Sequence, residues 1–113
     1  MRIPEFYKKF CFHDSLLKDI DYDDYAKFLT LKIDFCFWAQ DWYDSKEFPE
    51  TGLILVNFFD VSDFISEDRI LKSDSIDGIE LLGDNDLLIK VYDRDYFEMH
   101  IHAKSVEVEM LSE

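Results

Sequence analysis

Glycine, proline and cysteine are scarce in this chain, which contains three, two and two of them among 113 residues. So few glycines and prolines exclude a flexible, low-complexity chain, and they argue against a glycine-rich phosphate-binding loop. Cys11 and Cys36 have neither CxxC spacing nor the density of a secreted disulfide framework. We therefore expect both thiols to be reduced.

Long apolar runs are also absent. No window approaches the roughly 18 apolar residues that a membrane span requires. The opening MRIPEFYKKF contains no apolar run long enough for a signal peptide. These absences predict a cytoplasmic protein that does not enter a membrane.

Basic residues are too few to balance the acidic ones. The chain has 12 Lys and Arg against 26 Asp and Glu, which gives a formal net charge of -14. Such a field repels nucleic acids and anionic membrane surfaces and favours cationic partners, including basic proteins and metal ions. The alternative is an acidic surface that only keeps the protein soluble.

Apolar and aromatic residues are abundant. Hydrophobic residues make up 48% of the chain and aromatic residues 17%, with eleven Phe. This content is sufficient to close one core, which excludes a disordered acidic tail. Because no linker composition and no repeat divides the sequence, we expect a single domain over residues 1–113.

Alternating apolar and polar residues predict half-buried strands in four segments. The longest is residues 28–38, followed by residues 87–91, 97–101 and 106–110. The last three segments are predicted to form an antiparallel meander, with a turn at residues 93–95. The predicted apolar face of the first segment consists of Leu29, Leu31, Ile33, Phe35 and Phe37.

Other segments complete the predicted architecture. Residues 53–59 are apolar at nearly every position, which is typical of a central strand covered on both faces. Residues 76–82 and 15–20 are weaker strand candidates, and residues 61–71 have a partial helical stripe. About seven strands with little helix predict a mainly β protein, either a small antiparallel barrel or a highly curved sheet.

One predicted connection interleaves large aromatic residues with carboxylates. Loops are exposed more often than strands, and aromatic residues among charges are typical interface anchors. A second interpretation is that Trp42 and Phe48 fold back to plug one end of a barrel, and both stay open. The residues expected to contact a partner are Trp38, Asp41, Trp42, Tyr43, Asp44 and Phe48, with Tyr22 and Tyr25 extending the surface.

Three histidines raise the possibility of a metal site. His100 and His102 lie two apart on a predicted strand and share its face with Glu98, a donor set suited to a divalent transition metal. His13 joins them only if the fold brings it there. The alternative is that all are ordinary solvent-facing residues, and we expect no resident cofactor.

The acidic residues at 19, 21 and 23 have the spacing of the first ligands of a calcium loop. Asp24 stands where the loop's sharp turn needs glycine, and Thr30 stands where a bidentate glutamate is required. The match fails, so we expect a negative, solvated turn between two strands.

Catalytic motifs are missing. The chain has no G-x-S-x-G, no glycine-rich phosphate loop and no H-E-x-x-H. His13 and Asp14 are adjacent, and neighbouring side chains on an extended chain point to opposite faces. We therefore expect a protein that is not an enzyme.

The segment Phe12-His13-Asp14-Ser15 precedes an apolar and acidic strand, long alternation and a late pair of strands separated by Asp. In this pattern the chain resembles a group of small bacterial proteins of uncharacterised function, some classed as immunity proteins of polymorphic toxin systems. The resemblance implies a cytoplasmic protein without enzymatic activity that binds and neutralises a toxin.

The hypothesis from the sequence is an acidic binding protein that docks a cationic protein partner, such as a toxin, through aromatic residues surrounded by carboxylates. Two alternatives from other classes remain. One is a metal- or small-ligand-binding β domain. The other is a structural, oligomer-forming subunit whose outer strand adds to another sheet.

Overall fold

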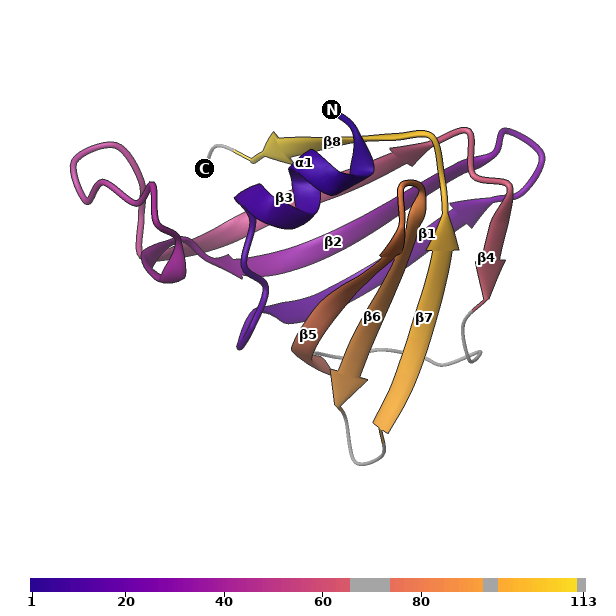
Figure 1. The fold of residues 1–113 in the computed structure, drawn as a ribbon. Coiled ribbons are helices and arrows are strands. Elements are labelled where there is room, and N and C mark those ends of the chain that lie inside the picture. The colour runs from indigo at the N-terminus through magenta and orange to yellow at the C-terminus, as the bar shows by residue number, and fades with distance from the viewer. Residues whose placement is uncertain (66–73, 93–95, 112–113) are drawn as a thin grey trace.

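The structure is a computed structural model that describes residues 1–65, 74–92 and 96–111. Within these residues it contains eight antiparallel strands, joined in one sheet, and a short helix (Figure 1). The order across the sheet is β4-β7-β6-β5-β1-β2-β3-β8. The elements are α1 (Ile3–Lys9), β1 (Leu16–Asp23), β2 (Phe28–Cys36), the 3-10 turn η1 (Phe37–Ala39), β3 (Thr51–Phe59), β4 (Asp63–Ile65), β5 (Asp74–Gly83), β6 (Asp86–Tyr92), β7 (Tyr96–His102) and β8 (Ser105–Met110).

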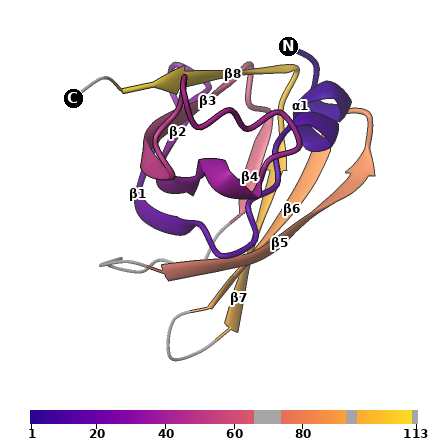
Figure 2. The same ribbon diagram turned by 90° about the vertical axis from the view of Figure 1, so that its left-hand side faces the viewer.

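The sheet bends into two halves that enclose the core. β1, β2, β3 and β8 form the first half-sheet, and β5, β6, β7 and β4 form the second. In the part of the chain that the structure describes, two residue pairs join β1 to β5, Leu16 with Ser75 and Leu17 with Asp74. Figures 1 and 2 both place α1 and β5–β7 on the same side of the first half-sheet. The other side of the first half-sheet has no element packed on it among the described residues.

The predicted meander of the last three strands is wrong in its final step. β5, β6 and β7 do follow one another, but β8 pairs with β3 at the opposite edge of the sheet. Only Ala103 and Lys104 connect β7 to β8, and the Lys104 N–H donates to the carbonyl of Phe59. The chain can cross in two residues because strong curvature brings the two ends of the sheet together at this corner.

The fold is therefore a highly curved, open antiparallel sheet. The mainly β class is confirmed, and the closed barrel is not, because β4 and β8 end the strand order without pairing with each other. About seven strands were predicted, and the additional strand is β4. It lies in residues 61–71, where the partial stripe predicted a helix. That prediction is wrong for its described part. Residues 66–71 and the predicted turn at residues 93–95 lie outside the described residues.

The alternation in β2 predicts the core correctly. Leu29, Leu31 and Phe35 are fully buried, and Ile33 and Phe37 are nearly so. The predicted covering of β3 on both faces is wrong. Ile54, Val56 and Phe58 are fully buried, but the intervening residues are partly exposed. Among the described residues, only one face of the first half-sheet is covered by other elements.

Helix α1 has no counterpart among the predicted elements. Ile3, Phe6 and Phe10 lie on one face of this segment and are buried, and Pro4 stands in the first turn, where its missing N–H costs nothing. The Phe6 ring packs edge-on against Phe58, with centroids 5.9 Å apart. The helix thus covers the inner face of the first half-sheet.

The FHDS segment forms a tight turn where β1, β2 and β5 meet. The Ser15 N–H donates to the Phe12 carbonyl at 2.9 Å, and Asp14 takes a left-handed φ of 68°, which Asp tolerates. Ser15 is fully buried. Its Oγ accepts the Cys36 N–H at 3.1 Å, and its carbonyl accepts the Ile76 N–H at 2.8 Å. These residues connect the two half-sheets.

Gln40 is a buried polar side chain that joins two segments. Its Oε1 accepts the Cys11 N–H at 2.8 Å, and its Nε2 donates to the carbonyls of Cys11 at 2.7 Å and Cys36 at 2.9 Å. The amide thus substitutes for strand pairing between the residues after α1 and the end of β2.

We expect Gln40→Ala to lower the free energy of unfolding by about 2–3 kcal/mol, because it leaves three main-chain groups without partners. Urea unfolding followed by circular dichroism measures this change. The neighbouring Asp41 is exposed, and Asp41→Ala should change stability by less than about 0.5 kcal/mol. Equal losses in the two variants would mean that the Gln40 amide contributes nothing specific.

Candidate functional site

The uncovered side of the first half-sheet, which we call the outer face, combines apolar residues with carboxylates. Because paired residues of neighbouring strands point to the same side, the strand registers place its side chains in rows from β1 to β8. None of these side chains is buried. The rows are Asp19–Lys32–Leu55–Glu109, Asp21–Thr30–Asn57–Glu107 and Asp23–Phe28–Phe59–Ser105, with Asp34 and Leu53 beyond the first.

Apolar side chains share the middle of the outer face with the hydrogen-bonded polar pair of the second row. Phe28 and Phe59 are in contact across β2 and β3, with ring centroids 5.2 Å apart. Leu55 is partly exposed, and Leu53 is exposed at 38%. Carboxylates of β1 border them on one side and those of β8 on the other. Apolar side chains inside a charged rim are the usual anatomy of a protein-binding surface.

The rim carboxylates are not neutralised within the described part of the chain. There, Asp21, Glu107 and Glu109 are exposed and make no ion pair. Lys32 is the basic side chain in the rows, and no ion pair joins it to Asp19, its neighbour on β1. The outer face therefore presents a net negative field to solvent.

The outward side of the second half-sheet differs in its charge pattern. Lys90 Nζ donates to Glu80 Oε1 at 2.6 Å, and this bond raises the pKa of Lys90. Asp86 Oδ1 lies 2.5 Å from His102 Nδ1 and 3.5 Å from His100 Nε2. Glu80 and Asp86 thus each have a partner on this side, so they offer a cationic partner less than the unpaired rim carboxylates of the outer face do.

The prediction of a negative, solvated turn at residues 19–23 is wrong. Asp19, Asp21 and Asp23 lie within strand β1, where they point to the outer face. Asp23 also caps the turn that follows, because its Oδ1 accepts the N–H groups of Tyr25 and Ala26 at 3.0 Å. A strand rather than a turn explains the two-residue spacing of these carboxylates.

The structure does not gather the predicted partner-contact residues into one surface. Trp42, Tyr43 and Phe48 are partly buried and pack against the core, whereas Asp41 and Asp44 are exposed and Trp38 is exposed at 55%.

Tyr22 and Tyr25 lie at the other end of β2 from these residues. The Tyr22 ring packs against Phe64, with centroids 5.0 Å apart. Tyr25 is exposed at 96% in the turn between β1 and β2.

The histidines are not brought together. His100 and His102 share the Asp86 carboxylate on the second half-sheet. His13 instead faces the Asp77 carbonyl at 2.8 Å, and this hydrogen bond, with Asp14 nearby, raises the pKa of His13. Within residues 1–65, 74–92 and 96–111, no three His, Cys, Asp or Glu side chains are placed to hold a metal ion.

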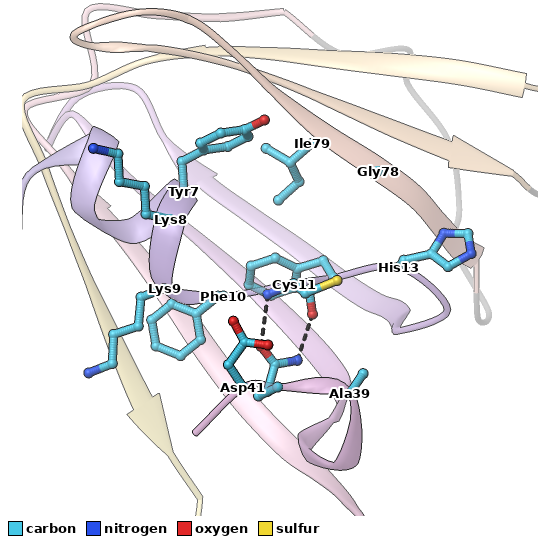
Figure 3. Close-up of a pocket in the computed structure, with 12 residues that line it drawn as sticks. Tyr7, Lys8, Lys9, Phe10, Cys11, His13, Ala39, Asp41, Gly78 and Ile79 are labelled. Carbon is cyan, nitrogen blue, oxygen red and sulfur yellow. Dashed lines mark hydrogen bonds between the residues drawn. The ribbon is translucent and has the colours of Figure 1, made fainter. Parts of the chain in front are cut away.

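A pocket of about 450 Å³ lies between the end of α1, residues 10–13, η1 and β5 (Figure 3). The polar groups that line it do not converge. Lys8 and Lys9 extend away from Cys11, and His13 lies at the far side. The Gln40 amide is already used by main-chain groups. This arrangement supplies neither a paired acid and base nor a cluster of cations for an anion.

Both cysteines are free thiols, as the sequence predicted. Cys11 is exposed, whereas burial raises the pKa of the Cys36 thiol and a hydrogen bond with Ser15 opposes this shift. A raised pKa reduces the thiolate fraction, so Cys36 is the less reactive of the two.

The helix of the described region is too short to cross a membrane. Comparisons with protein-family models, with curated proteins and with solved structures found no match.

The outer face was not predicted from the sequence, although a signal for it exists. The nearly unbroken apolar run of residues 53–59 indicated two covered faces, and only one is covered. The other apolar positions of β3 therefore mark a surface that the rest of the described chain leaves open.

Proposed function

We propose that this chain is a non-enzymatic acidic binding protein that docks a basic protein partner on its outer face. The observation that carries the proposal is the pattern of β3. Three of its four outward residues from 53 to 59, Leu53, Leu55 and Phe59, are apolar, and they lie on an uncovered sheet face between the carboxylates of β1 and those of β8. A basic partner would cover the apolar centre and neutralise the rim.

The two parts of the outer face serve different steps of binding. Carboxylates on the rim, in a chain of formal net charge -14, accelerate the encounter with a cationic protein and reject anionic ones. Apolar side chains at the centre lose water in the complex and supply most of its lasting affinity. Association should therefore weaken as salt rises, while the apolar contribution persists.

The proposal extends to the nature of the partner. The resemblance to small bacterial immunity proteins makes a toxin the first candidate, and a cytoplasmic location belongs to the same proposal. A basic toxin held on the outer face would be neutralised by occupation of its own cationic surface, without any chemical step in this chain.

The test begins with recovery of the tagged protein from its native cells at low salt, followed by mass spectrometry of retained proteins. The main candidate is then purified, and its dissociation constant is measured by calorimetry over a salt series. We expect Leu55→Ser to weaken binding about tenfold, because it removes an apolar contact from the centre of the interface. Leu82→Ser is the matched control, since Leu82 is exposed at 55% on the second half-sheet.

Two results would reject the proposal. One is a purified partner of acidic or neutral charge whose affinity does not change with salt. The other is equal binding by wild type, Leu55→Ser and Leu82→Ser, which would place the contact elsewhere. Circular dichroism of each variant confirms that the fold is kept, since the outer side chains of β3 do not enter the core.

A further inference from the structure

β8 is an edge strand with a bonding pattern that accepts an additional strand. The main-chain nitrogen of Met1 donates a hydrogen bond to the Val106 carbonyl at 2.7 Å, and the Val106 N–H donates to the Met1 carbonyl at 2.9 Å. Alternate residues of a strand bond to the same side, so Val108 and Met110 direct their main-chain groups to that same edge. Beyond Met1, the described chain supplies no strand to this edge.

Charge is the one usual protection against strand addition that β8 carries. Natural edge strands are shortened, bulged, covered, or carry Pro or charged side chains, and β8 has Glu107 and Glu109. β8 has the sequence SVEVEM, and its register with β3 runs without interruption. The opposite edge strand, β4, has three residues within the described part of the chain. β8 therefore offers an open hydrogen-bonding edge that β4 does not.

The charge of β8 determines which kind of strand can pair with this edge. Glu107 and Glu109 point to the outer face from β8. A second copy of this chain pairing β8 with β8 would bring glutamates of both copies together, which is destabilising. A strand with Lys or Arg beside Glu107 and Glu109 would instead form favourable cross-strand pairs.

We infer that the basic partner inserts an extended segment along the outer edge of β8, with basic and apolar residues in alternation. This inference rests on the proposed function and specifies how the partner is recognised. Basic side chains of the segment lie beside Glu107 and Glu109, and its apolar side chains lie beside Val108 and Met110. Met110 is exposed at 44%, so an added strand would cover apolar surface.

The size of the outer face supports a role for the edge. Three strand spacings by the nine-residue length of β3 correspond to about 14 by 30 Å, or about 400 Å². A stable interface buries about 800 Å² on each partner. A strand added at β8 lies next to the outer face and enlarges the same contact surface.

The probe for the edge is a short capped peptide in which Lys and Val alternate, titrated into the isotope-labelled protein and followed by NMR. We expect the amides of Val108 and Met110 to shift and to become protected from hydrogen exchange. A peptide of the same composition with all Lys before all Val is the control, and it should bind at least about fivefold more weakly because it cannot match the alternation.

Met110→Pro removes the outward N–H at the edge while sparing the bonds to β3, and Met110→Leu retains that N–H. We expect Met110→Pro to weaken binding of the alternating peptide about tenfold and Met110→Leu to bind like wild type. If Met110→Pro does not fold, the double variant Glu107→Lys, Glu109→Lys decides. It should bind an alternating Glu and Val peptide in place of the Lys and Val peptide.

Other outcomes overturn the inference. Equal peptide binding by Met110→Pro and wild type would exclude pairing at β8, and so would a salt-independent dimer that Met110→Pro disrupts, because a second copy would then occupy the edge. The purified partner separates this inference from the proposed function. If Leu55→Ser weakens binding of the partner and Met110→Pro does not, the edge is rejected and the outer face is kept. If Met110→Pro weakens binding and Leu55→Ser does not, the outer face is rejected and the edge is kept.

Discussion

Trp42→Ala is expected to lower the free energy of unfolding by about 3 kcal/mol, whereas Trp38→Ala should lower it by less than about 1 kcal/mol. The two tryptophans belong to the same aromatic and acidic segment, and the sequence does not distinguish them. The structure does, because Trp38 is exposed at 55% and Trp42 packs against the core.

The contacts of Trp42 explain the size of the expected loss. Its ring lies 5.8 Å from Phe10, 5.2 Å from Phe48 and 6.3 Å from Phe37, in edge-on arrangements that add to the burial energy. Its Nε1–H donates to the Lys9 carbonyl at 2.8 Å, at the end of α1. Truncation to Ala removes these contacts together and leaves a cavity between α1 and β2.

Urea unfolding monitored by circular dichroism measures both variants at one pH. Trp42→Phe serves as an intermediate, because it keeps one aromatic ring while it loses the N–H donor and part of the ring volume, and it should be less destabilising than Trp42→Ala. If Trp42→Ala and Trp38→Ala were equally stable, the contacts around Trp42 would contribute little, and Trp42 would return as a candidate interface residue.

The parts of the fold that follow from local periodicity could be predicted. β2 shows why, since the period of two from Leu29 to Phe35 directly reports which side chains are buried. β6, β7 and β8 were also recognisable as strands. Their order was not, because local alternation carries no information about which distant strand will pair. β8 joins β3 through curvature of the whole sheet.

The short elements α1 and β4 were not predicted for another reason. α1 has only seven residues, and its apolar positions Ile3, Phe6 and Phe10 derive their stability from packing against the sheet. β4 has three residues and is specified by its pairing with β7. In both elements, tertiary contacts outweigh local propensity.

The candidate site could be predicted from the sequence less well than the fold. Composition indicated an acidic binding protein, but it located the contact surface in the aromatic segment after β2. The carboxylates at 19, 21 and 23 and those at 107 and 109 are far apart in sequence. They become two rims of one surface only because β1 and β8 both belong to the first half-sheet. Sequence spacing alone cannot report such a relation.

Charge reversal at the rims is expected to have the largest effect on binding. The triple variant Asp21→Lys, Glu107→Lys, Glu109→Lys should weaken association with the purified basic partner by at least about a hundredfold at low salt. Like charges then face one another across the interface, which costs several kcal/mol and slows the encounter. Calorimetry gives the affinity, and stopped-flow fluorescence gives the association rate.

The matched control reverses three exposed carboxylates in the segment after β2, Asp41→Lys, Glu47→Lys and Glu50→Lys. Both triple variants change the net charge equally, so a general electrostatic effect would weaken binding to the same extent. We expect the control to lose no more than about tenfold, because its charges act from outside the contact.

The comparison also decides between the two surfaces that the chain offers. A greater loss of affinity in the control variant would place the partner on the aromatic segment after β2 and reject the outer face.

The stability of the triple variant at the rims supplies an independent check, because Asp21, Glu107 and Glu109 make no ion pair within the described residues. Their reversal reduces the self-repulsion of a chain with a formal net charge of -14, so the folded state should be as stable as wild type or more stable. Lost binding without lost stability would then be a property of the outer face itself.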